Sequence, residues 1–356
     1  MKKKILSAIL AGMFALGSFS ISDAMSREEI SAINVSKSGN FKFWEKNSPA
    51  KEKLVSYVKD VTDKKSKNFI PIEDRIAVFD MDGTFICETA PYYFEWMLYL
   101  ERALYDKNYS PSAEERDYAK SIEEGIRVTK KFPQNVDTGE ARAQAKVFEG
   151  MTSAEYKNYI ENFMDKPVEG LSNLKWGEAF YLPMIEVIKF LQKNDFKVYV
   201  VSGSDRELIR ILLGDAVDIP KNQIIGTDIK ILANNQGDTD GLNYKFNKGD
   251  YLIRGEFVIK DLQMNKTSSI YREIGKQPVL AFGNSGGDLS MINYTINNNK
   301  YKSAGFFVIC DDTDREFGKP KRAVSDTELA KDNGWTPISM RNDWKTIYGD
   351  NVKVTK

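Results

Sequence analysis

Hydrophobic and polar residues along the chain form two alternating patterns. Short apolar runs occur at 76–79, 279–282 and 306–309, and a similar run at 197–201 begins with one lysine. This pattern is typical of strands that are buried on both faces of a parallel sheet. Between the runs lie segments whose apolar residues recur at helical spacing. Buried strands that alternate with helices predict an α/β fold built on a doubly wound parallel sheet.

One long segment interrupts this alternation directly after the first predicted strand. Residues 89–179 are rich in Glu, Lys, Tyr and Ala and poor in β-branched runs. They predict helices at about 91–104, 111–130 and 152–163, the last opening with the capping-box spacing of Thr152 and Glu155. A helical insertion at this point is well placed to cover the carboxyl edge of the sheet as a lid.

The chain has 356 residues, enough for two domains or for one domain with a large insertion. The stretch before the first strand is polar and mixed with one helical pattern, so we expect it to pack on the main domain. A polar, Gly- and Asn-rich stretch at 224–257 predicts a hairpin. The predicted division is a signal peptide at 1–24, an N-terminal extension at 25–71, an α/β core at 72–88 and 180–356, and a helical cap at 89–179.

The first residues resemble a targeting segment. Three lysines at 2–4 precede an apolar stretch at 5–19, and small residues follow up to Ala24. This order predicts a signal peptide cleaved near Ala24 and a periplasmic or secreted protein. The alternative is an uncleaved N-terminal anchor, although the apolar run is short for a membrane span. No later stretch is apolar enough to predict a span once the signal is removed.

The composition of the chain limits the types of catalytic and metal-binding site that it can form. The 51 basic and 51 acidic side chains cancel, and no long run of one charge predicts binding to nucleic acid. The chain has no histidine, which excludes His-ligated metals and Ser-His-Asp triads. Carboxylates and lysines must therefore do the chemistry. For the two cysteines, Cys87 and Cys310, we favour buried thiols over a disulfide, because sequence does not supply the geometry of a bridge.

The strongest candidate site follows the run 76–79, in the sequence DMDGT. Asp80 and Asp82 are two apart, so both can face one crevice at the carboxyl edge of the sheet. Gly83 permits a sharp turn, and Thr84 follows. Two carboxylates at the end of a buried strand are costly without a cation or a task. One can act as a nucleophile while the other handles protons; the alternative is a turn in which Asp and Gly serve only the backbone.

A second polar cluster follows the run 197–201. Ser202 and Gly203, in the tripeptide SGS, stand at the strand end ahead of a predicted helix. A hydroxyl and free backbone N–H groups in this position suit phosphate binding. Serine and glycine also populate ordinary turns, so the position after a buried strand is what supports the prediction.

Two further sequence features add residues to the candidate site. Lys266 stands at the head of a predicted helix, where it is either a solvated surface charge or a group that neutralises a phosphate. The run 279–282 ends in GNSGGD, whose Asn284 and Asp288 offer the oxygen ligands that Mg²⁺ requires. Each feature alone also fits a structural turn or surface. Their order along the chain makes coincidence improbable.

Aromatic residues gather on the first helix of the insertion. Tyr92, Trp96 and Tyr99 fall on one predicted face, beside Glu88 and Glu95. They form either an aromatic box for a cationic leaving group or, as such stripes more often do, part of the core.

The four motifs DMDGT, SGS, the isolated Lys266 and GNSGGD resemble, in this order, those of the haloacid dehalogenase-like (HAD) hydrolases. The resemblance runs from about Arg75 to the C-terminus. Within the family the chain is similar to secreted or periplasmic phosphatases with a helical C1-type cap, near the phosphoserine-phosphatase-like branch. The pieces VFEGMT, YLPMIEVIKFL, VYVVSGS, GNSGGDLSM and GWTPISMRNDWKTIY carry this narrower likeness.

The resemblance implies a role for each residue. Asp80 is the nucleophile that becomes an aspartyl-phosphate, and Asp82 is the general acid and then the general base. Many members have Asp where this chain has Asn284, so either the Asn284 amide oxygen or Asp288 is the direct ligand. The implied substrate-binding residues are Thr84, Ser202, Gly203 and Lys266, and the implied Mg²⁺ ligands are Asp80, Asp82, Asn284 and Asp288.

Together these observations predict an exported, Mg²⁺-dependent hydrolase of a small organic phosphomonoester. Dehalogenase chemistry is disfavoured because it uses neither a cation nor the second carboxylate. Two alternatives remain open. One is a phosphotransferase or mutase that uses the same intermediate, and the other is an exported protein that binds a phosphorylated ligand and has lost turnover.

Overall fold

The computed structural model describes residues 24–355; the rest of the predicted signal peptide, residues 1–23, lies outside them. A seven-stranded sheet forms the centre, in the order β5-β4-β3-β1-β6-β7-β8. All neighbouring strands are parallel except β5, which runs antiparallel to β4. The predicted α/β class is confirmed. The strands are β1 Ile76–Phe79, β3 Lys197–Asp205, β4 Ile224–Ala233, β5 Leu252–Ile259, β6 Leu280–Gly283, β7 Ala304–Ile309 and β8 Thr336–Ser339.

Strand β1 is the middle of the sheet, and all of its residues are buried. It pairs in register with β3 and β6, so that Phe79 lies opposite both Val200 and Phe282. The rings of Phe79 and Phe282 stack with centroids 4.1 Å apart. Because the three strands are parallel, their carboxyl ends meet at one edge, and this edge receives the residues that follow each strand.

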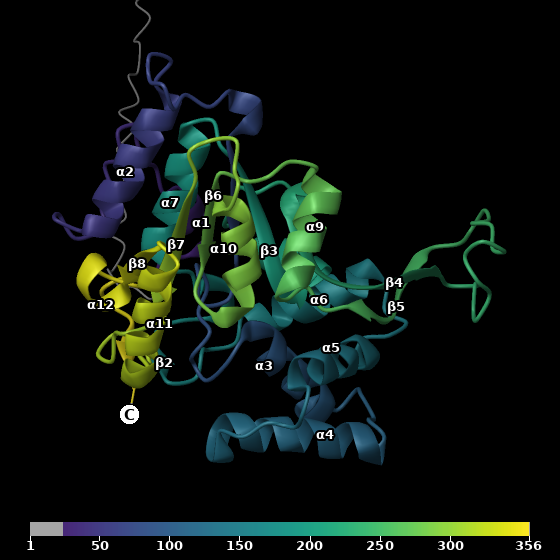
Figure 1. Cartoon of the computed structure of the whole chain (residues 1–356). Helices are drawn as coiled ribbons and strands as arrows, with labels where there is room; N and C mark the ends of the chain where they lie inside the picture. The colour runs from purple at the N-terminus through teal and green to yellow at the C-terminus, as the bar shows by residue number, and fades with distance from the viewer. Residues whose placement is uncertain (1–23, 356) are drawn as a thin grey trace, which may run out of the picture.

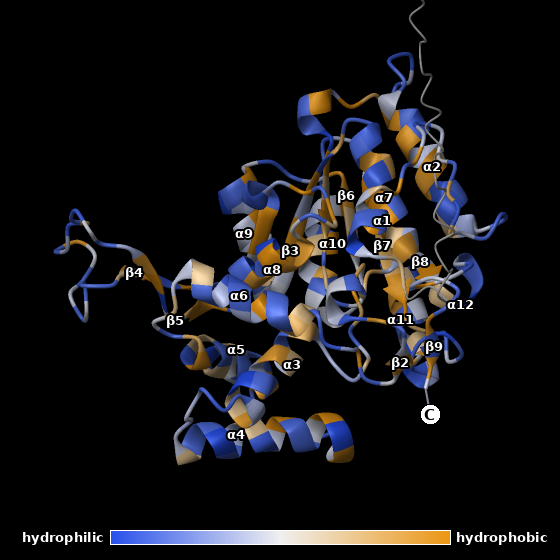
Figure 2. Cartoon of the chain, turned by 180° about the vertical axis from the view of Figure 1, so that it is seen from behind, coloured by the Kyte–Doolittle hydropathy of each residue, from blue (hydrophilic) through white to orange (hydrophobic). Residues whose placement is uncertain are grey.

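Helices cover both faces of the sheet (Figure 1). Successive strand residues point to opposite faces, so Ala77 and Phe79 join one apolar cluster and Val78 joins the other. The strands are mostly apolar where these helices cover them, as the hydropathy colouring in Figure 2 shows. One face carries α2 Pro49–Thr62, α7 Leu182–Lys193 and α8 Arg206–Leu213, and the other carries α9 Met264–Ile274, α10 Leu289–Ile296 and α11 Pro320–Asp332.

The N-terminal segment, which includes α1 Arg27–Ser31 and α2, is fastened to the core by buried polar contacts. The indole Nε1–H of Trp44 donates to the Pro183 carbonyl at 2.9 Å. The carboxylate of Glu186, on α7, accepts the backbone N–H groups of Lys42 at 2.7 Å and Phe43 at 3.0 Å. These bonds satisfy backbone groups that would otherwise be buried without partners.

Helices α3 Phe94–Leu100, α4 Ala113–Glu124 and α5 Val136–Val147 gather beyond one end of the sheet, as Figure 1 shows. The predicted helices at 91–104 and 111–130 begin two to three residues later than expected, and each passes into a π-helical turn, at Glu101–Tyr105 and Gly125–Thr129. The domain boundaries stay a prediction.

The predicted capping box is confirmed at α6 Ser153–Met164, where the Thr152 hydroxyl accepts the Glu155 N–H at 3.2 Å. Helix α5 was not predicted; its N-cap Asn135 makes no side-chain hydrogen bond in the structure. The short remaining elements are β2 Leu171–Ser172, which pairs with β9 Lys353–Val354, the helix α12 Met340–Asp343, and 3₁₀ turns at Ile72–Asp74, Trp176–Glu178, Lys221–Gln223 and Gly286–Asp288.

Strands β4 and β5 extend past the sheet as a projecting two-stranded arm (Figure 1), and this confirms the predicted hairpin. The two cysteines are both free, as expected; Cys87 is buried and Cys310 is partly buried. Within residues 24–355, no helix has the length and apolar character needed to cross a membrane.

We predict that Glu186→Ala lowers the free energy of unfolding by about 2–3 kcal/mol, because two backbone N–H groups lose a charged acceptor. Urea unfolding followed by circular dichroism measures the change. The control is Glu328→Ala on α11, whose side chain is exposed and whose loss should change stability by less than about 0.5 kcal/mol. Equal effects of the two substitutions would contradict the prediction.

Candidate active site

The turn after β1 is shaped by backbone bonds and by one glycine. The Asp80 N–H continues the sheet by donating to the Phe282 carbonyl at 2.9 Å, and the Gly83 N–H donates to the Ile86 carbonyl at 2.7 Å. Gly83 has φ +76°, and a Cβ there would lie 1.9 Å from the side-chain nitrogen of Asn284. The turn therefore requires glycine both for its backbone angle and for its close approach to the turn after β6.

A buried lysine connects two carboxylates at this edge. The Lys266 ammonium lies 2.6 Å from Asp80 Oδ1 and 2.7 Å from Asp288 Oδ1. Burial alone would lower the pKa of Lys266, but Asp288 and Asp80 together raise it above its usual value, so the lysine stays charged. Burial and the charge of Asp288 raise the pKa of Asp80 to about 7, against the opposing effect of Lys266.

Asp82 has a different environment. Its Oδ2 accepts the Ser204 hydroxyl at 2.8 Å, and its buried Oδ1 has no hydrogen-bond partner among the described residues. Burial, and next the charge of Asp80, raise the pKa of Asp82 to about 8. Asp82 therefore tends to carry a proton at neutral pH, as a general acid requires.

The turn after β6 folds around Asp288. Its Oδ2 accepts the backbone N–H groups of Asn284 at 3.0 Å and Ser285 at 3.1 Å, while its Oδ1 faces Lys266. Both oxygens of Asp288 are therefore in use. By contrast, the Asn284 amide oxygen lies 3.4 Å from the Thr84 hydroxyl, which is itself 3.2 Å from Asp80 Oδ2.

These contacts test whether the residues fit the predicted Mg²⁺. Carboxylate, amide and hydroxyl oxygens of Asp80, Asn284 and Thr84 lie together, and they are the hard donors that Mg²⁺ prefers. Within residues 24–355, no three Asp, Glu, Cys or His side chains group as metal ligands. These oxygens would fit an oxygen-preferring cation, whereas both oxygens of Asp288 are occupied by Lys266 and by backbone N–H groups. The ligand roles of Asp288 and of the Asp82 carbonyl stay predictions.

The SGS tripeptide lies within a longer strand than expected, since β3 continues to Asp205. Ser202 is fully buried, and its Oγ accepts the Ser204 N–H at 3.1 Å. It is Gly203 and Ser204, not Ser202, that line the cavity beside the two aspartates. The predicted phosphate contact of Ser202 stays a prediction, and the contact of Ser204 with Asp82 was missed although the residue stands in the same motif.

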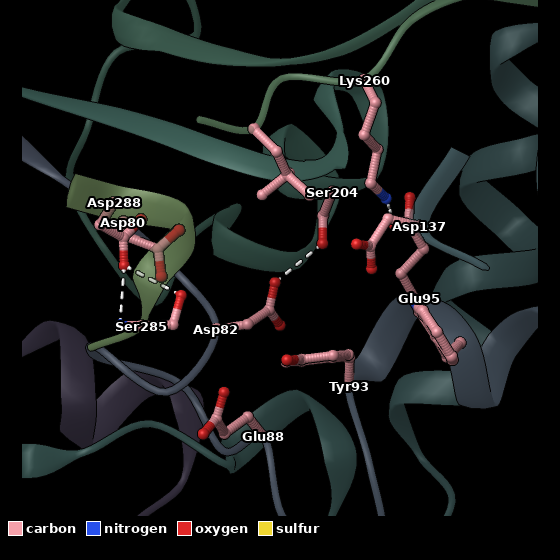
Figure 3. A pocket seen from close by; sticks show the side chains of 13 residues that line it. Asp80, Asp82, Glu88, Tyr93, Glu95, Asp137, Ser204, Lys260, Ser285 and Asp288 are labelled. Carbon is pink, nitrogen blue, oxygen red and sulfur yellow. Dashed lines mark hydrogen bonds and ion pairs between the residues drawn. The ribbon is translucent and has the colours of Figure 1, made fainter. Parts of the chain in front are cut away.

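Residues of the core and of the helical insertion line a cavity of about 80 Å³ (Figure 3). The core contributes predicted site residues from the ends of β1, β3 and β6. The insertion contributes Trp96 and Glu95, which the sequence analysis left open between an aromatic box and the core, and Tyr93 and Asp137, which it did not name. The lining residues are Asp80, Asp82, Glu88, Tyr93, Glu95, Trp96, Asp137, Gly203, Ser204, Lys260, Leu262, Ser285 and Asp288.

A second buried lysine joins the insertion to the core. Lys260 Nζ lies 3.4 Å from Glu95 Oε2 on α3 and 3.5 Å from Glu140 Oε2 on α5. The other oxygen of Glu95 accepts the Asp205 N–H, at the end of β3, at 2.6 Å. Sequence reasoning missed this network because its members lie far apart along the chain, and none belongs to a local motif.

The family follows from a direct comparison of the sequence. The model of the haloacid dehalogenase-like hydrolases matches residues 77–293, which is more than half of the chain. The chain therefore belongs to this family, as the order of its four motifs had indicated. No curated protein matches the sequence significantly.

Solved structures with a similar fold include three with low sequence identity. A conserved protein of unknown function from Anaerococcus prevotii DSM 20548 is 13% identical, with 85% of this chain and 94% of that chain covered and a TM-score of 0.48. Cytosolic 5′-nucleotidase IIIB bound to cytidine is 13% identical, with coverages of 82% and 87% and a TM-score of 0.48. A phosphoserine phosphohydrolase-like protein from Francisella tularensis is 15% identical, with coverages of 66% and 87% and a TM-score of 0.36.

We predict that Lys266→Met, measured by urea unfolding in EDTA, lowers the free energy of unfolding by about 3 kcal/mol, since it leaves two buried carboxylates facing each other. The matched control is Lys276→Met. Lys276 also pairs with an aspartate, Asp74, at 2.5 Å, but its side chain is 45% exposed. Loss of this exposed pair should cost less than about 1 kcal/mol. Similar losses for the two variants would refute the assignment of Lys266 as the buried link.

Proposed function

We propose that this chain is an exported, Mg²⁺-dependent phosphomonoester hydrolase that acts on a small organic phosphate through an aspartyl-phosphate. The observation that carries the proposal is the pair of unlike aspartates in one cavity. Asp80 is held by the charged Lys266, whereas Asp82 has a raised pKa and hydrogen-bonds Ser204. Membership of the haloacid dehalogenase-like hydrolases supports the reaction class. The lysine-rich, apolar N-terminus supports export.

In the first step, a carboxylate oxygen of Asp80 attacks phosphorus in line with the ester bond. The phosphorus–oxygen bond to the leaving group breaks, and the leaving oxygen takes the proton of Asp82. The products are the free alcohol and an acyl phosphate on Asp80.

In the second step, Asp82 accepts a proton from water as the water oxygen attacks phosphorus. The acyl-phosphate bond breaks, inorganic phosphate leaves, and the Asp80 carboxylate is restored. Lys266 offsets the charge on the phosphoryl oxygens, and the backbone N–H of Gly203 with the hydroxyls of Thr84 and Ser202 binds them. A bound Mg²⁺, held by Asp80, the Asp82 carbonyl and Asn284, supplies the remaining positive charge that phosphoryl transfer requires.

The second candidate is a protein that binds a phosphorylated ligand without turning it over, which the amide at Asn284 favours. Transfer of the phosphoryl group to an acceptor other than water is a variant of the first proposal. The reaction products distinguish ligand binding and phosphoryl transfer from hydrolysis, because only hydrolysis releases inorganic phosphate in an Asp80-dependent manner.

We predict that Asp80→Asn lowers kcat for p-nitrophenyl phosphate by about 10⁴-fold or more, because no carboxylate remains to attack phosphorus. The substitution keeps the shape of the side chain, so folding is checked by circular dichroism. Rapid acid quenching with radiolabelled substrate should trap label on the natural protein and none on the variant. Asp80-independent release of phosphate would exclude the mechanism, and tight binding without release would favour the binding protein.

We predict that Asn284→Asp lowers the Mg²⁺ concentration for half-maximal activity by about tenfold, because it adds a negative charge to the ligands of the cation. Titration of the hydrolysis rate with MgCl₂ after EDTA treatment measures this. Asn297→Asp adds the same charge at an exposed position on the core and should leave the titration unchanged. An unaltered Mg²⁺ dependence in Asn284→Asp would remove Asn284 from the ligand set.

A further inference from the structure

The cavity has two ends, separated by Asp82. In Figure 3, Asp80, Ser285 and Asp288 lie on one side of Asp82, and side chains from the insertion lie on the other. Under the proposed function, Asp82 protonates the leaving oxygen, so the alcohol of the substrate must extend to the far side. We call this side the leaving-group end and define it by Tyr93, Glu95, Trp96, Asp137 and Lys260.

The leaving-group end carries an excess of negative charge. Lys260 is its single cation, and Glu95 faces it at 3.4 Å. Burial and the charge of Glu95 raise the pKa of Glu140, behind the cavity, well above its usual value, so Glu140 tends to be neutral. Asp137 is exposed to solvent, and its charge also acts on Lys260, so this one lysine serves two carboxylates of the leaving-group end, Glu95 and Asp137. The Asp137 carboxylate makes no hydrogen bond or ion pair within 4 Å with the described residues, and Figure 3 shows it at the edge of the cavity.

A further carboxylate lies near Asp82. Glu88 is 3% exposed, and Figure 3 shows its side chain directed at the cavity from below. Its carboxylate forms an ion pair at 4.0 Å with Arg322, whose side chain is 36% exposed, and a hydrogen bond with the Asn284 side chain. Glu88 therefore adds a partly neutralised negative charge to the cavity near Asp82.

Two aromatic rings complete the wall. Tyr93 and Trp96 line the cavity with ring centroids 5.9 Å apart and planes inclined by 65°. The predicted stripe of Tyr92, Trp96 and Tyr99 is only partly at the site, because Tyr99 is fully buried and Tyr92 packs against Trp96. Aromatic faces beside carboxylates form a surface that binds organic cations.

The size of the cavity limits the leaving group. A volume of about 80 Å³ corresponds to on the order of six water positions at 10–15 Å³ each. This small volume favours a phosphoryl group with a small alcohol over a bulky leaving group such as a nucleoside.

We propose that the substrate is the phosphate ester of a small amino alcohol, whose ammonium group lies between the Asp137 carboxylate and the rings of Tyr93 and Trp96. The inference rests on the proposed function and names the substrate class of the same site. The ester bond still breaks between phosphorus and oxygen, and the cationic alcohol leaves with the proton of Asp82.

The test compares two esters of the same shape. Phosphocholine and 3,3-dimethylbutyl phosphate differ by a charged nitrogen in place of a carbon. We expect kcat/KM to be at least about tenfold higher for phosphocholine, since an ion pair and cation–π contacts act on the charge alone. Phosphoethanolamine, with a smaller ammonium, tests whether methyl groups are needed.

The reference substrate p-nitrophenyl phosphate separates the two hypotheses. Asp80-dependent hydrolysis of it with no preference for phosphocholine would overturn the inference and leave the proposed function standing. An absence of hydrolysis of every ester would overturn both.

A variant locates the preference in the cavity. Asp137→Asn should reduce the ratio of kcat/KM between phosphocholine and its uncharged analogue by about tenfold, because it removes one negative charge from the leaving-group end. Asp137→Glu should retain part of the preference. The control is Asp117→Asn on α4, an exposed carboxylate outside the cavity, which should keep the ratio of the natural protein. An unchanged ratio in Asp137→Asn would contradict the placement of the cation.

Discussion

A buried ammonium between two buried carboxylates is the contact on which the rest of the site depends. Asp80 follows β1, Lys266 stands in the first turn of α9, and Asp288 belongs to the turn after β6. Without the lysine, two carboxylates would face each other in a region of low dielectric constant, and such repulsion is costly. Lys266 thus holds together three segments distant in sequence and leaves one net negative charge at the position of attack.

The second buried lysine, Lys260, links the insertion to the core by ion pairs. Strand β5 returns along β4 only as far as the pairing of Ile259 with Asp228, just beyond the carboxyl end of β3. Because the antiparallel strand stops there, Lys260 arrives at the edge of the sheet rather than at its far end. The following few residues lead directly to Lys266. One short connection therefore carries the cation that binds the insertion and the cation that faces Asp80.

Local sequence patterns sufficed to predict the strands along the chain and the polar residues that follow them. Parallel strands in register then bring these polar residues to one edge of the sheet. This reasoning located Asp80, Asp82 and Asp288 in the cavity and Lys266 beside it. The same reasoning failed for side-chain contacts that depend on where a helix begins and on the direction in which each of its residues points. Helix α3 begins at Phe94 rather than at Pro91, and the aromatic residue that reaches the cavity with Trp96 is Tyr93.

The balance of charge connects the two ends of the cavity. Six of its lining residues are acidic, namely Asp80, Asp82, Glu88, Glu95, Asp137 and Asp288, and the one lysine among them is Lys260. A phosphate ester adds further negative charge, so its binding to such a wall is favourable only if positive charge enters with it. At the Asp80 end, Lys266 supplies part of this charge, and the oxygen donors beside it suit a divalent cation. At the Asp137 end, Lys260 is the one lining cation for both Glu95 and Asp137, so this end keeps an excess of negative charge that a cationic group on the substrate would offset.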